Sequence, residues 1–267
     1  MKTSNVTRYT LSVCVAALTF TGCGGASTTP ITEPLRTEGS AFDAAVSKST
    51  IYVANLGGDK VTAYSPKGKH GKLTLTITTG INGPFGVAVD KNGKIFVTNT
   101  SPYYPGGNVT SYASDGKQTT PTITAGIDFP LGIVVTKSGK IYVANLRGPT
   151  SSGSGSINTY KPDGTQTTPT ITAGIAGPVG VTLDDRGKIY VANAFNNSVT
   201  TYRSDGTQTT PTITAGLNFP EGIAVDANGK IYVVNHGGVS SSGSITTYTA
   251  DGTQTTPTIT AGIEGPV

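Results

Sequence analysis

Few residues of this sequence could do chemistry, and the most conspicuous one lies in a repeated stretch. Glu221 belongs to FPEGIAVDANGKIYVVN, and three similar stretches carry Phe85, Leu131 or Val179 in its place. His236 follows directly after the stretch. A glutamate and a histidine within hydrogen-bond reach could serve as general acid and base. The alternative is an acid on the rim of a scaffold and a loop histidine that never meet.

A second group of candidates suits binding rather than catalysis. Tyr103 and Tyr104 lie in SPYYPGG, and Arg147 begins RGPTSSGSGS. Tyrosine offers an apolar body with a polar tip, so these side chains could hold a small ligand, a glycan or a protein. The alternative is that both segments are solvated, flexible loops rich in Gly and Ser.

Several function classes find no support in the composition. The chain has two His, two Cys and no G-x-S-x-G sequence, so neither a zinc site nor a Ser-His-Asp triad is indicated. The formal net charge of +4 comes from 19 basic and 15 acidic residues that are scattered along the chain. Nucleic-acid binding needs a concentrated basic face, and we therefore exclude it.

The first 22 residues have the pattern of a signal peptide. Lys2 and Arg8 precede an apolar core, Leu11–Phe20, which is too short to cross a bilayer as a helix. The following FTGC resembles the bacterial lipobox, which implies that Cys23 is lipidated as the signal is removed. The alternative is a secretory signal cut near Ala26.

The segment after the signal resembles the tether of a bacterial lipoprotein. Residues 23–40 are small, polar and proline-bearing, and we expect them to be flexible. Because Asp does not follow Cys23, the resemblance favours the outer membrane or cell surface over the inner membrane. The expected contact with the membrane is the lipid anchor alone.

The rest of the chain, residues 41–267, is repetitive. The sequence P-x-G, with its last copy cut at Val267, begins at Pro84, Pro130, Pro178, Pro220 and Pro266, in steps of 46, 48, 42 and 46 residues. In the unit 178–219, the segments GVTLD, KIYVAN, SVTTY and TPTITAGI are short, rich in β-branched or aromatic residues, and bounded by Gly, Asp or Pro. Four antiparallel strands in each repeat of this length predict an all-β fold, the β-propeller.

The repeated pattern P-x-G-[IV]-x-V-D-x-x-G-K-I-[YF]-V-x-N resembles the NHL repeat and the related regucalcin and gluconolactonase group. Five complete blades are visible, at approximately 41–83, 84–129, 130–177, 178–219 and 220–265. Because that group commonly has six blades, we expect a six-bladed ring from which this chain is truncated. A closed five-bladed ring is the alternative.

The variation in repeat length indicates which face of the propeller binds. It falls entirely between the second and third strands, in the loops that contain SPYYPGG, RGPTSSGSGS and HGGVSSSGS. In an up-and-down blade these loops lie on the same face as the P-x-G loops. Insertions gathered on one face of a repeat array usually mark its binding face. Candidate residues there are Tyr103, Tyr104, Arg147, Glu221 and His236.

The resemblance to gluconolactonase implies a divalent cation held by acid and amide side chains from several blades. In this chain the middle residues of P-x-G are Phe85, Leu131, Val179, Glu221 and Val267, so only Glu221 could ligate a hard cation, with Asp43 near the equivalent place in the first blade. We therefore favour a non-catalytic binding scaffold with no cofactor. The alternative is a metal-dependent hydrolase or lyase that uses Glu221.

The opposite face is expected to be structural. Its turns carry D-x-N-G sequences such as Asp90–Gly93 and Asp226–Gly229, but the complete calcium loop motif is absent. Hairpin turns with Gly at positive φ explain this pattern. His70, in KGKHGK, is expected in a solvated basic turn on this face.

Overall fold

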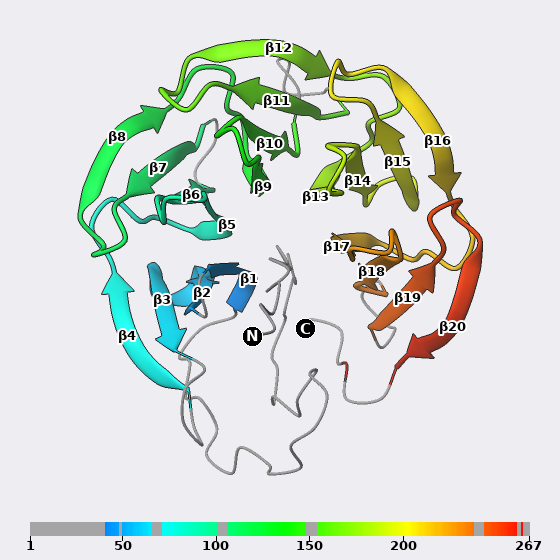
Figure 1. Cartoon of the computed structure of the whole chain (residues 1–267), viewed down its shortest axis with the longest axis horizontal. Helices are drawn as coiled ribbons and strands as arrows, with labels where there is room; N and C mark the ends of the chain where they lie inside the picture. The colour runs from blue at the N-terminus through cyan, green and yellow to red at the C-terminus, as the bar shows by residue number, and fades with distance from the viewer. Residues whose placement is uncertain are drawn as a thin grey trace, which may run out of the picture.

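The computed structural model confirms an all-β propeller of five four-stranded antiparallel sheets (Figure 1). The structure describes residues 41–47, 50–65, 71–100, 106–147, 154–237, 243–260 and 263. Each sheet consists of four strands that are consecutive in the sequence. Within the described ranges the one helical element is the short 3-10 turn η1 (Leu56–Gly58), and none is long and apolar enough to cross a membrane.

The strand bounds follow the repeat. The first two blades contain β1 (Ala41–Ser47), β2 (Thr50–Asn55), β3 (Lys60–Ser65) and β4 (Lys72–Ile77), then β5 (Pro84–Val89), β6 (Ile95–Asn99), β7 (Asn108–Tyr112) and β8 (Gln118–Ile123). The third contains β9 (Pro130–Val135), β10 (Ile141–Asn145), β11 (Ser156–Tyr160) and β12 (Gln166–Ile171). The last two contain β13 (Pro178–Leu183), β14 (Ile189–Asn193), β15 (Ser198–Tyr202) and β16 (Gln208–Ile213), then β17 (Pro220–Val225), β18 (Ile231–Asn235), β19 (Ser244–Tyr248) and β20 (Gln254–Ile259).

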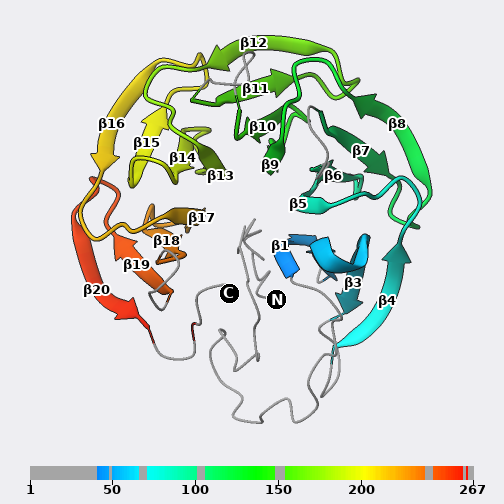
Figure 2. The same ribbon diagram turned by 180° about the vertical axis from the view of Figure 1, so that it is seen from behind.

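The position of a strand in its blade explains its composition. The first strands, β1, β5, β9, β13 and β17, line the axis, and the fourth strands form the outer rim (Figures 1 and 2). The second strand has a neighbouring blade on each side, so all five residues of β14 are buried and its sequence, IYVAN, is nearly continuously apolar. The outer strand β16 has one covered side, so its sequence alternates between exposed and covered residues.

Glycine of P-x-G lets adjacent first strands approach each other. A Cβ added to Gly180 would stand 2.3 Å from the Glu221 carbonyl oxygen, in the next blade. The corresponding distances are 2.4 Å from Gly86 to the Leu131 oxygen and 2.5 Å from Gly132 to the Val179 oxygen. Backbone atoms cannot yield as a flexible side chain would, so any larger residue would push two blades apart.

A tyrosine at the end of each later third strand joins its blade to the preceding one. The hydroxyl of Tyr202 donates to the carbonyl oxygen of Ala173 at 2.8 Å, and Tyr112, Tyr160 and Tyr248 make equivalent bonds at 2.8, 2.9 and 2.7 Å. Burial raises the pKa of Tyr202 and raises that of Tyr160 to about 12. These phenols remain neutral donors at physiological pH.

The first and last blades are not hydrogen-bonded to each other through any described strand (Figure 1). The sheet side of the last blade that carries Tyr232, Val234 and Ile245 is only partly covered. The equivalent residues of the fourth blade, Tyr190, Ala192 and Val199, are 2%, 0% and 0% exposed. Strand pairing that closes the ring between the first and last blades is therefore absent from this part of the chain.

Candidate functional site

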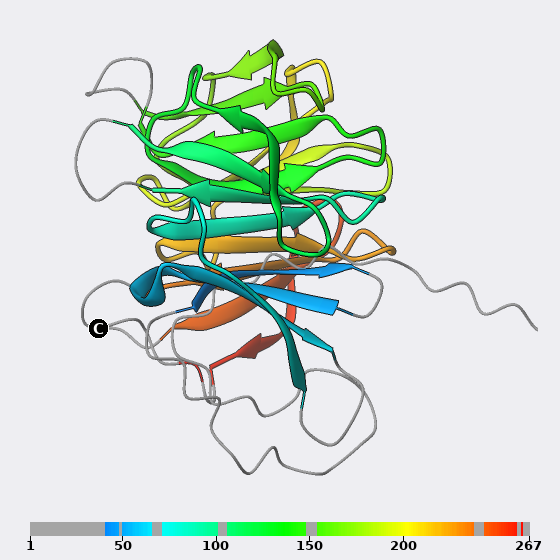
Figure 3. The ribbon, with the colours of Figure 1, turned by 90° about the vertical axis from the view of Figure 1, so that its left-hand side faces the viewer.

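The P-x-G face brings together three of the residues that the sequence singled out. Hydrogen bonds join the P-x-G loops to the residues that follow the second strands, since the N–H groups of Ala194 and His236 donate to the Gly177 and Phe219 carbonyls at 2.9 and 3.0 Å. In the edge-on view of Figure 3, η1, which follows β2, lies at one end of the propeller. Glu221 is the second residue of β17, Arg147 follows β10, and His236 follows β18. Tyr103, Tyr104 and Cys23 lie outside the described residues, as does His70.

In the four later blades, a buried asparagine at the end of the second strand fixes the P-x-G loop above it. The side-chain oxygen of Asn193 accepts the backbone N–H of Ala176 at 3.1 Å, while its amide donates to Thr200 Oγ1 at 2.9 Å. Asn99, Asn145 and Asn235 accept equivalent backbone N–H groups at 3.1, 3.1 and 3.0 Å. These four asparagines therefore position the P-x-G loops, whereas the Oδ1 atom of Asn55 in the first blade is buried without a hydrogen-bond partner among the described residues.

The residue before each P-x-G proline has left-handed backbone geometry. Its φ is 57° at Gly83, 54° at Phe129, 62° at Gly177 and 52° at Phe219. Glycine adopts this conformation without a steric cost, whereas a bulky residue rarely does so. Two phenylalanines are thus held in a strained conformation that two glycines adopt freely in the same fold.

Hydrogen bonds on both sides hold these left-handed residues. The N–H of Phe219 donates to the side-chain oxygen of Asn197 in the preceding blade at 2.7 Å, and its carbonyl accepts from the N–H of His236 at 3.0 Å. At Phe129 the equivalent bonds run to the Gly106 carbonyl at 3.0 Å and from the Leu146 N–H at 3.1 Å. The variable loop of each blade thereby sets the P-x-G loop of the next.

Three phenylalanine rings lie beside the P-x-G loops of three successive blades. Arg147 lies over the ring of Phe129, 5.7 Å from its centroid, and the His236 ring is 5.6 Å from that of Phe219. In the blade between them, where the pre-proline residue is Gly177, the ring comes from Phe195 in the loop after β14. A Cβ on Gly177 would stand 2.5 Å from atoms of that ring. Phe195 is 62% exposed.

Sequence reasoning missed these three rings. The available signal was the alternation of F-P and G-P before the repeated P-x-G, together with AFNN in a loop of minimal length. Four of the seven phenylalanines of the chain, Phe85, Phe129, Phe195 and Phe219, belong to this face.

An apolar cluster lies beneath the rings. Leu131, Val179 and Ala194 form its buried centre, and Phe85, Phe129, Leu146 and Phe219 pack against it. Leu131 and Val179 are the middle residues of P-x-G, so the cluster reaches the innermost strands. The candidate site therefore combines a preformed apolar floor with a few polar groups, which is typical of ligand sites.

Glu221 adds one carboxylate to the axial ring. Loss of solvation raises its pKa from 4.5 to about 7, and its carboxyl group makes no hydrogen bond or ion pair with another described residue. His236 makes no hydrogen bond to Glu221, and its pKa is lowered by burial. Its Nδ1 is buried without a partner in the described part of the chain. The two side chains do not form the acid and base pair that one sequence hypothesis required.

Among the residues that the structure describes, no three His, Cys, Asp or Glu side chains gather where they could hold a metal ion. The register of the first blade also changes one expectation. Ala41 pairs with Asn55 and Asp43 with Ala54, as Pro178 pairs with Asn193 and Gly180 with Ala192. Asp43 therefore takes the place of the glycine of P-x-G, one residue beyond the position equivalent to Glu221.

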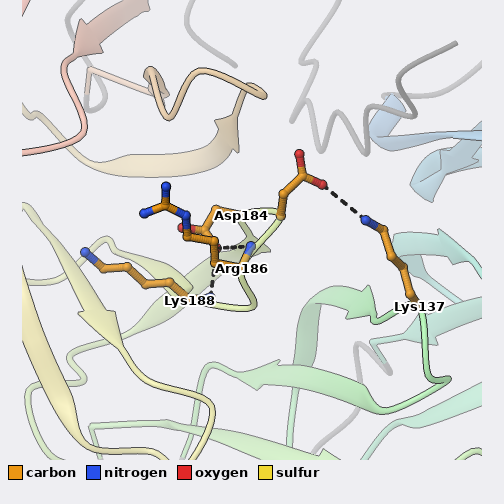
Figure 4. Close-up of polar contacts among 5 residues, drawn as sticks. Lys137, Asp184, Arg186 and Lys188 are labelled. Carbon is orange, nitrogen blue, oxygen red and sulfur yellow. Dashed lines mark hydrogen bonds and ion pairs between the residues drawn. The ribbon is translucent and has the colours of Figure 1, made fainter. Parts of the chain in front are cut away.

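The turns of the opposite face use their aspartates to hold the backbone. In the turn 184–187, Asp184 Oδ1 accepts the N–H groups of Arg186 and Lys188, both at 2.9 Å (Figure 4). Asp90 and Asp226 make equivalent pairs of bonds. Gly187 has a φ of 82°, and the ion pair between Lys137 and Asp185, 3.4 Å apart, is exposed. This arrangement agrees with hairpin turns, in which one carboxylate oxygen of each of these aspartates accepts two backbone N–H groups.

Comparison with known proteins supports the fold. No protein-family model and no curated protein matches the sequence. A chain of a nidogen and laminin complex is 18% identical, with a TM-score of 0.64 over 81% of this chain and 78% of that one. Virginiamycin B lyase from Staphylococcus aureus, bound to quinupristin, is 16% identical, with a TM-score of 0.62 over 83% and 71%. A gluconolactonase-family protein is 14% identical, with a TM-score of 0.61 over 79% and 73%. At these identities the similarity is one of β-propeller fold.

Proposed function

We propose that this protein is a non-catalytic binding propeller whose P-x-G face takes a ligand or a protein. The observation that carries the proposal is the set of phenylalanine rings above an apolar floor on this face. Phe195 is exposed while Phe129 and Phe219 are half-buried, and an accessible apolar patch on one surface usually marks an interaction site. One of the structural neighbours is a chain from a complex of two proteins, nidogen and laminin.

The geometry of the face supports binding because its rings are fixed before a ligand arrives. The backbone of Phe219 is hydrogen-bonded on both sides, and Phe195 donates its N–H to the Ala176 carbonyl at 3.1 Å. Groups that are already ordered lose less entropy when they bind. Covering the exposed part of Phe195 contributes about 1–2 kcal/mol, or about tenfold in affinity.

The experiment compares substitutions on the P-x-G face with a substitution on the outer strand β4, which carries no candidate residues. Labelled protein, residues 24–267, is applied to arrays of immobilised oligosaccharides and peptides. We expect each ligand captured by the wild type to bind about tenfold more weakly to Phe195→Ala and Phe219→Ala. Leu73→Ala is the matched control because Leu73 is 51% exposed on the outer strand β4. Failure to capture any ligand, or equal binding by all variants, contradicts the proposal.

We also place this binding function at the bacterial cell envelope, with Cys23 as the lipid anchor. The support is the signal-like sequence of residues 1–22 and the FTGC sequence. In cells that express the full chain, a lipid analogue should label the protein, and Cys23→Ala should abolish both the label and the membrane attachment. Attachment that persists in Cys23→Ala refutes the anchor.

A metal-dependent hydrolase or lyase is the second candidate, and one observation favours it. A carboxyl group with a pKa of about 7 at the axis can exchange protons near neutral pH. This function requires further ligands from outside the described residues. A structure of the full chain soaked in calcium or magnesium tests it: a cation bound by Glu221 and at least two other blade residues would establish the metal site.

A further inference from the structure

We infer that the turns of the first three blades, on the face opposite to P-x-G, form a docking surface for a membrane of anionic lipids. The inference goes beyond the proposed function, because it concerns the other face of the propeller and a different partner. It adds a second contact to the lipid anchor, which the sequence predicts as the only contact with the membrane. Lysines that are scattered along the sequence come together on this face because the repeat returns each turn to the same end of its blade.

The first step is the distribution of charge around this face. The described turns and adjoining strand ends of the first three blades carry seven lysines and three aspartates, whereas those of the last two carry four basic and five acidic residues. The seven lysines, here called the basic patch, are Lys72, Lys91, Lys94, Lys117, Lys137, Lys140 and Lys161. Residues 48–49 and 66–70 contain three further lysines and no acid, but they lie outside the described residues. The local charge therefore changes from positive to slightly negative around the ring.

The second step is that the charges of the basic patch are available to a partner. Four of its lysines are exposed and make no ion pair with a described residue: Lys72, Lys91, Lys117 and Lys161. The aspartates of the same turns bond to the backbone instead, as Asp163 does when it accepts the N–H of Thr165 at 2.9 Å. Among the described residues the one ion pair of the patch joins Lys137 to Asp185 of the fourth blade (Figure 4). Direct pairing with acids therefore does not neutralise the patch.

The third step is the even shape of the face. In the four later blades, all eight turns have five residues and the same two backbone hydrogen bonds. In the turn 90–94, the Asp90 N–H donates to the Lys94 carbonyl at 2.9 Å and the Gly93 N–H donates to the Asp90 carbonyl at 3.1 Å. These turns lie at the end of the propeller opposite to η1 (Figure 3). Because they have equal lengths, a flat partner can meet the lysines of several blades at once.

The fourth step selects the class of anionic partner. Proteins read nucleic acids with an element that enters a groove or with aromatic side chains that stack on bases. The described turns of the basic patch contain no aromatic residue, and the nearby rings of Phe96 and Tyr142 are 2% and 1% exposed beneath Lys94 and Lys140. Ammonium groups spread over short, level turns fit a plane of phosphate headgroups better than a nucleic acid.

The proposed lipid anchor permits this orientation. The first blade begins at the P-x-G end, since Ala41 pairs with Asn55. Residues 23–40 span at most about 60 Å when extended, and a six-residue strand such as β5 spans about 20 Å. The segment is therefore long enough for the basic patch to reach the membrane that holds Cys23. The P-x-G face then points away from the membrane, where it can meet its ligand.

Two double variants with the same change in formal charge test the basic patch. Lys91→Glu/Lys117→Glu reverses two lysines in the turns of the second blade. Arg186→Glu/Arg203→Glu, the matched control, reverses two arginines in the corresponding turns of the fourth blade. All four side chains are exposed, and the hydrogen bonds of these turns use backbone atoms at each of the four positions. We therefore expect both variants to fold, and thermal melts check this.

The experiment measures co-sedimentation of residues 24–267, which contain every described strand, with lipid vesicles. The vesicles consist of phosphatidylcholine alone or with about one third phosphatidylglycerol. We expect binding to the anionic vesicles only, and it should weaken between about 20 and 200 mM salt as the charges are screened. A lysine near an anionic surface contributes about fivefold in affinity, so Lys91→Glu/Lys117→Glu should bind about 25-fold more weakly or worse. The loss in Arg186→Glu/Arg203→Glu should stay below about fivefold, because acids surround these arginines in the sequence.

Three other outcomes overturn the inference. Equal binding to both kinds of vesicle, or binding to neither, refutes a docking surface for anionic lipids. Equal losses in the two double variants assign the binding to net charge and not to the basic patch. Binding to a DNA duplex at a lower protein concentration than to the anionic vesicles makes the partner a nucleic acid. The ligand function of the P-x-G face is tested separately, by Phe195→Ala and Phe219→Ala, and survives each of these results.

Discussion

Replacing Glu221 with glutamine should stabilise the protein in neutral and alkaline solution but not in acid. Burial raises the pKa of the folded carboxyl group from 4.5 to about 7. Between these pH values the unfolded chain releases a proton that the folded chain retains, so the wild type loses stability as the pH rises. Glutamine cannot ionise, and the free energy of unfolding of the variant lacks this contribution.

The size of the effect follows from the difference in pKa. A rise of the pKa from 4.5 to about 7 corresponds to a ceiling of about 3 kcal/mol at pH values above 7. Glu221 retains contact with water, and solvent screening reduces this ceiling to about 1–3 kcal/mol. The stability difference between Glu221→Gln and the wild type should begin to grow near pH 4.5 and level off above about pH 7.

Urea unfolding at half-unit intervals from pH 4 to pH 9 measures this difference, because subtraction removes the contributions of the other ionisable groups. Val179→Ala, at the equivalent place in the neighbouring blade, is the control. It should lower stability by about 1–2 kcal/mol at every pH, since no ionisable group is lost. A difference for Glu221→Gln that stays constant across the range would refute the desolvation argument.

The remaining predictions concern the contacts that hold the blades and loops. Gly180→Ala should cost about 2–3 kcal/mol, because its Cβ would meet a backbone oxygen at 2.3 Å, and thermal melts should show a smaller loss for Gly187→Ala. Asn193→Ala should cost about 1–3 kcal/mol in urea unfolding, because the Ala176 N–H loses its acceptor. Tyr202→Phe should lower the free energy of unfolding by about 1 kcal/mol in the same measurement, because the Ala173 carbonyl loses the hydroxyl donor of Tyr202. An unchanged unfolding midpoint in Gly180→Ala, Asn193→Ala or Tyr202→Phe would show that the contact named for that variant does not contribute to stability.

The repeat period and strand composition were sufficient to predict the fold. The buried second strands and the half-covered outer strands have different sequences because they have different numbers of covered sides. The amino-acid sequence alone shows that difference, as a nearly continuous apolar segment against an alternating one. The role of the asparagines that end the second strands could not be predicted from the sequence. The hydrogen bond that Asn193 accepts from Ala176 forms only when the preceding loop folds over the end of β14.

The candidate site was only partly predictable for a related reason. Insertion lengths identified the face, and the P-x-G alignment placed Glu221 at the axis. Alignment compares residues at the same register, so it could not show that the Phe195 ring lies against Gly177. That ring comes from a different loop and fills the space where a side chain at Gly177 would stand. Contacts between segments that lie 18 residues apart carry no periodic signal.

The strained phenylalanines, Phe129 and Phe219, can be compared with glycines at the same position in other blades. Gly83 and Gly177 adopt the left-handed conformation in the same hydrogen-bonded setting, so the propeller can be built with glycine at this position. A bulky residue there costs about 1–2 kcal/mol more. Packing against Leu131 and Val179 offsets part of that cost. Backbone strain that the fold does not require is expected where a residue also serves a function, and it supports the proposed binding role of Phe129 and Phe219.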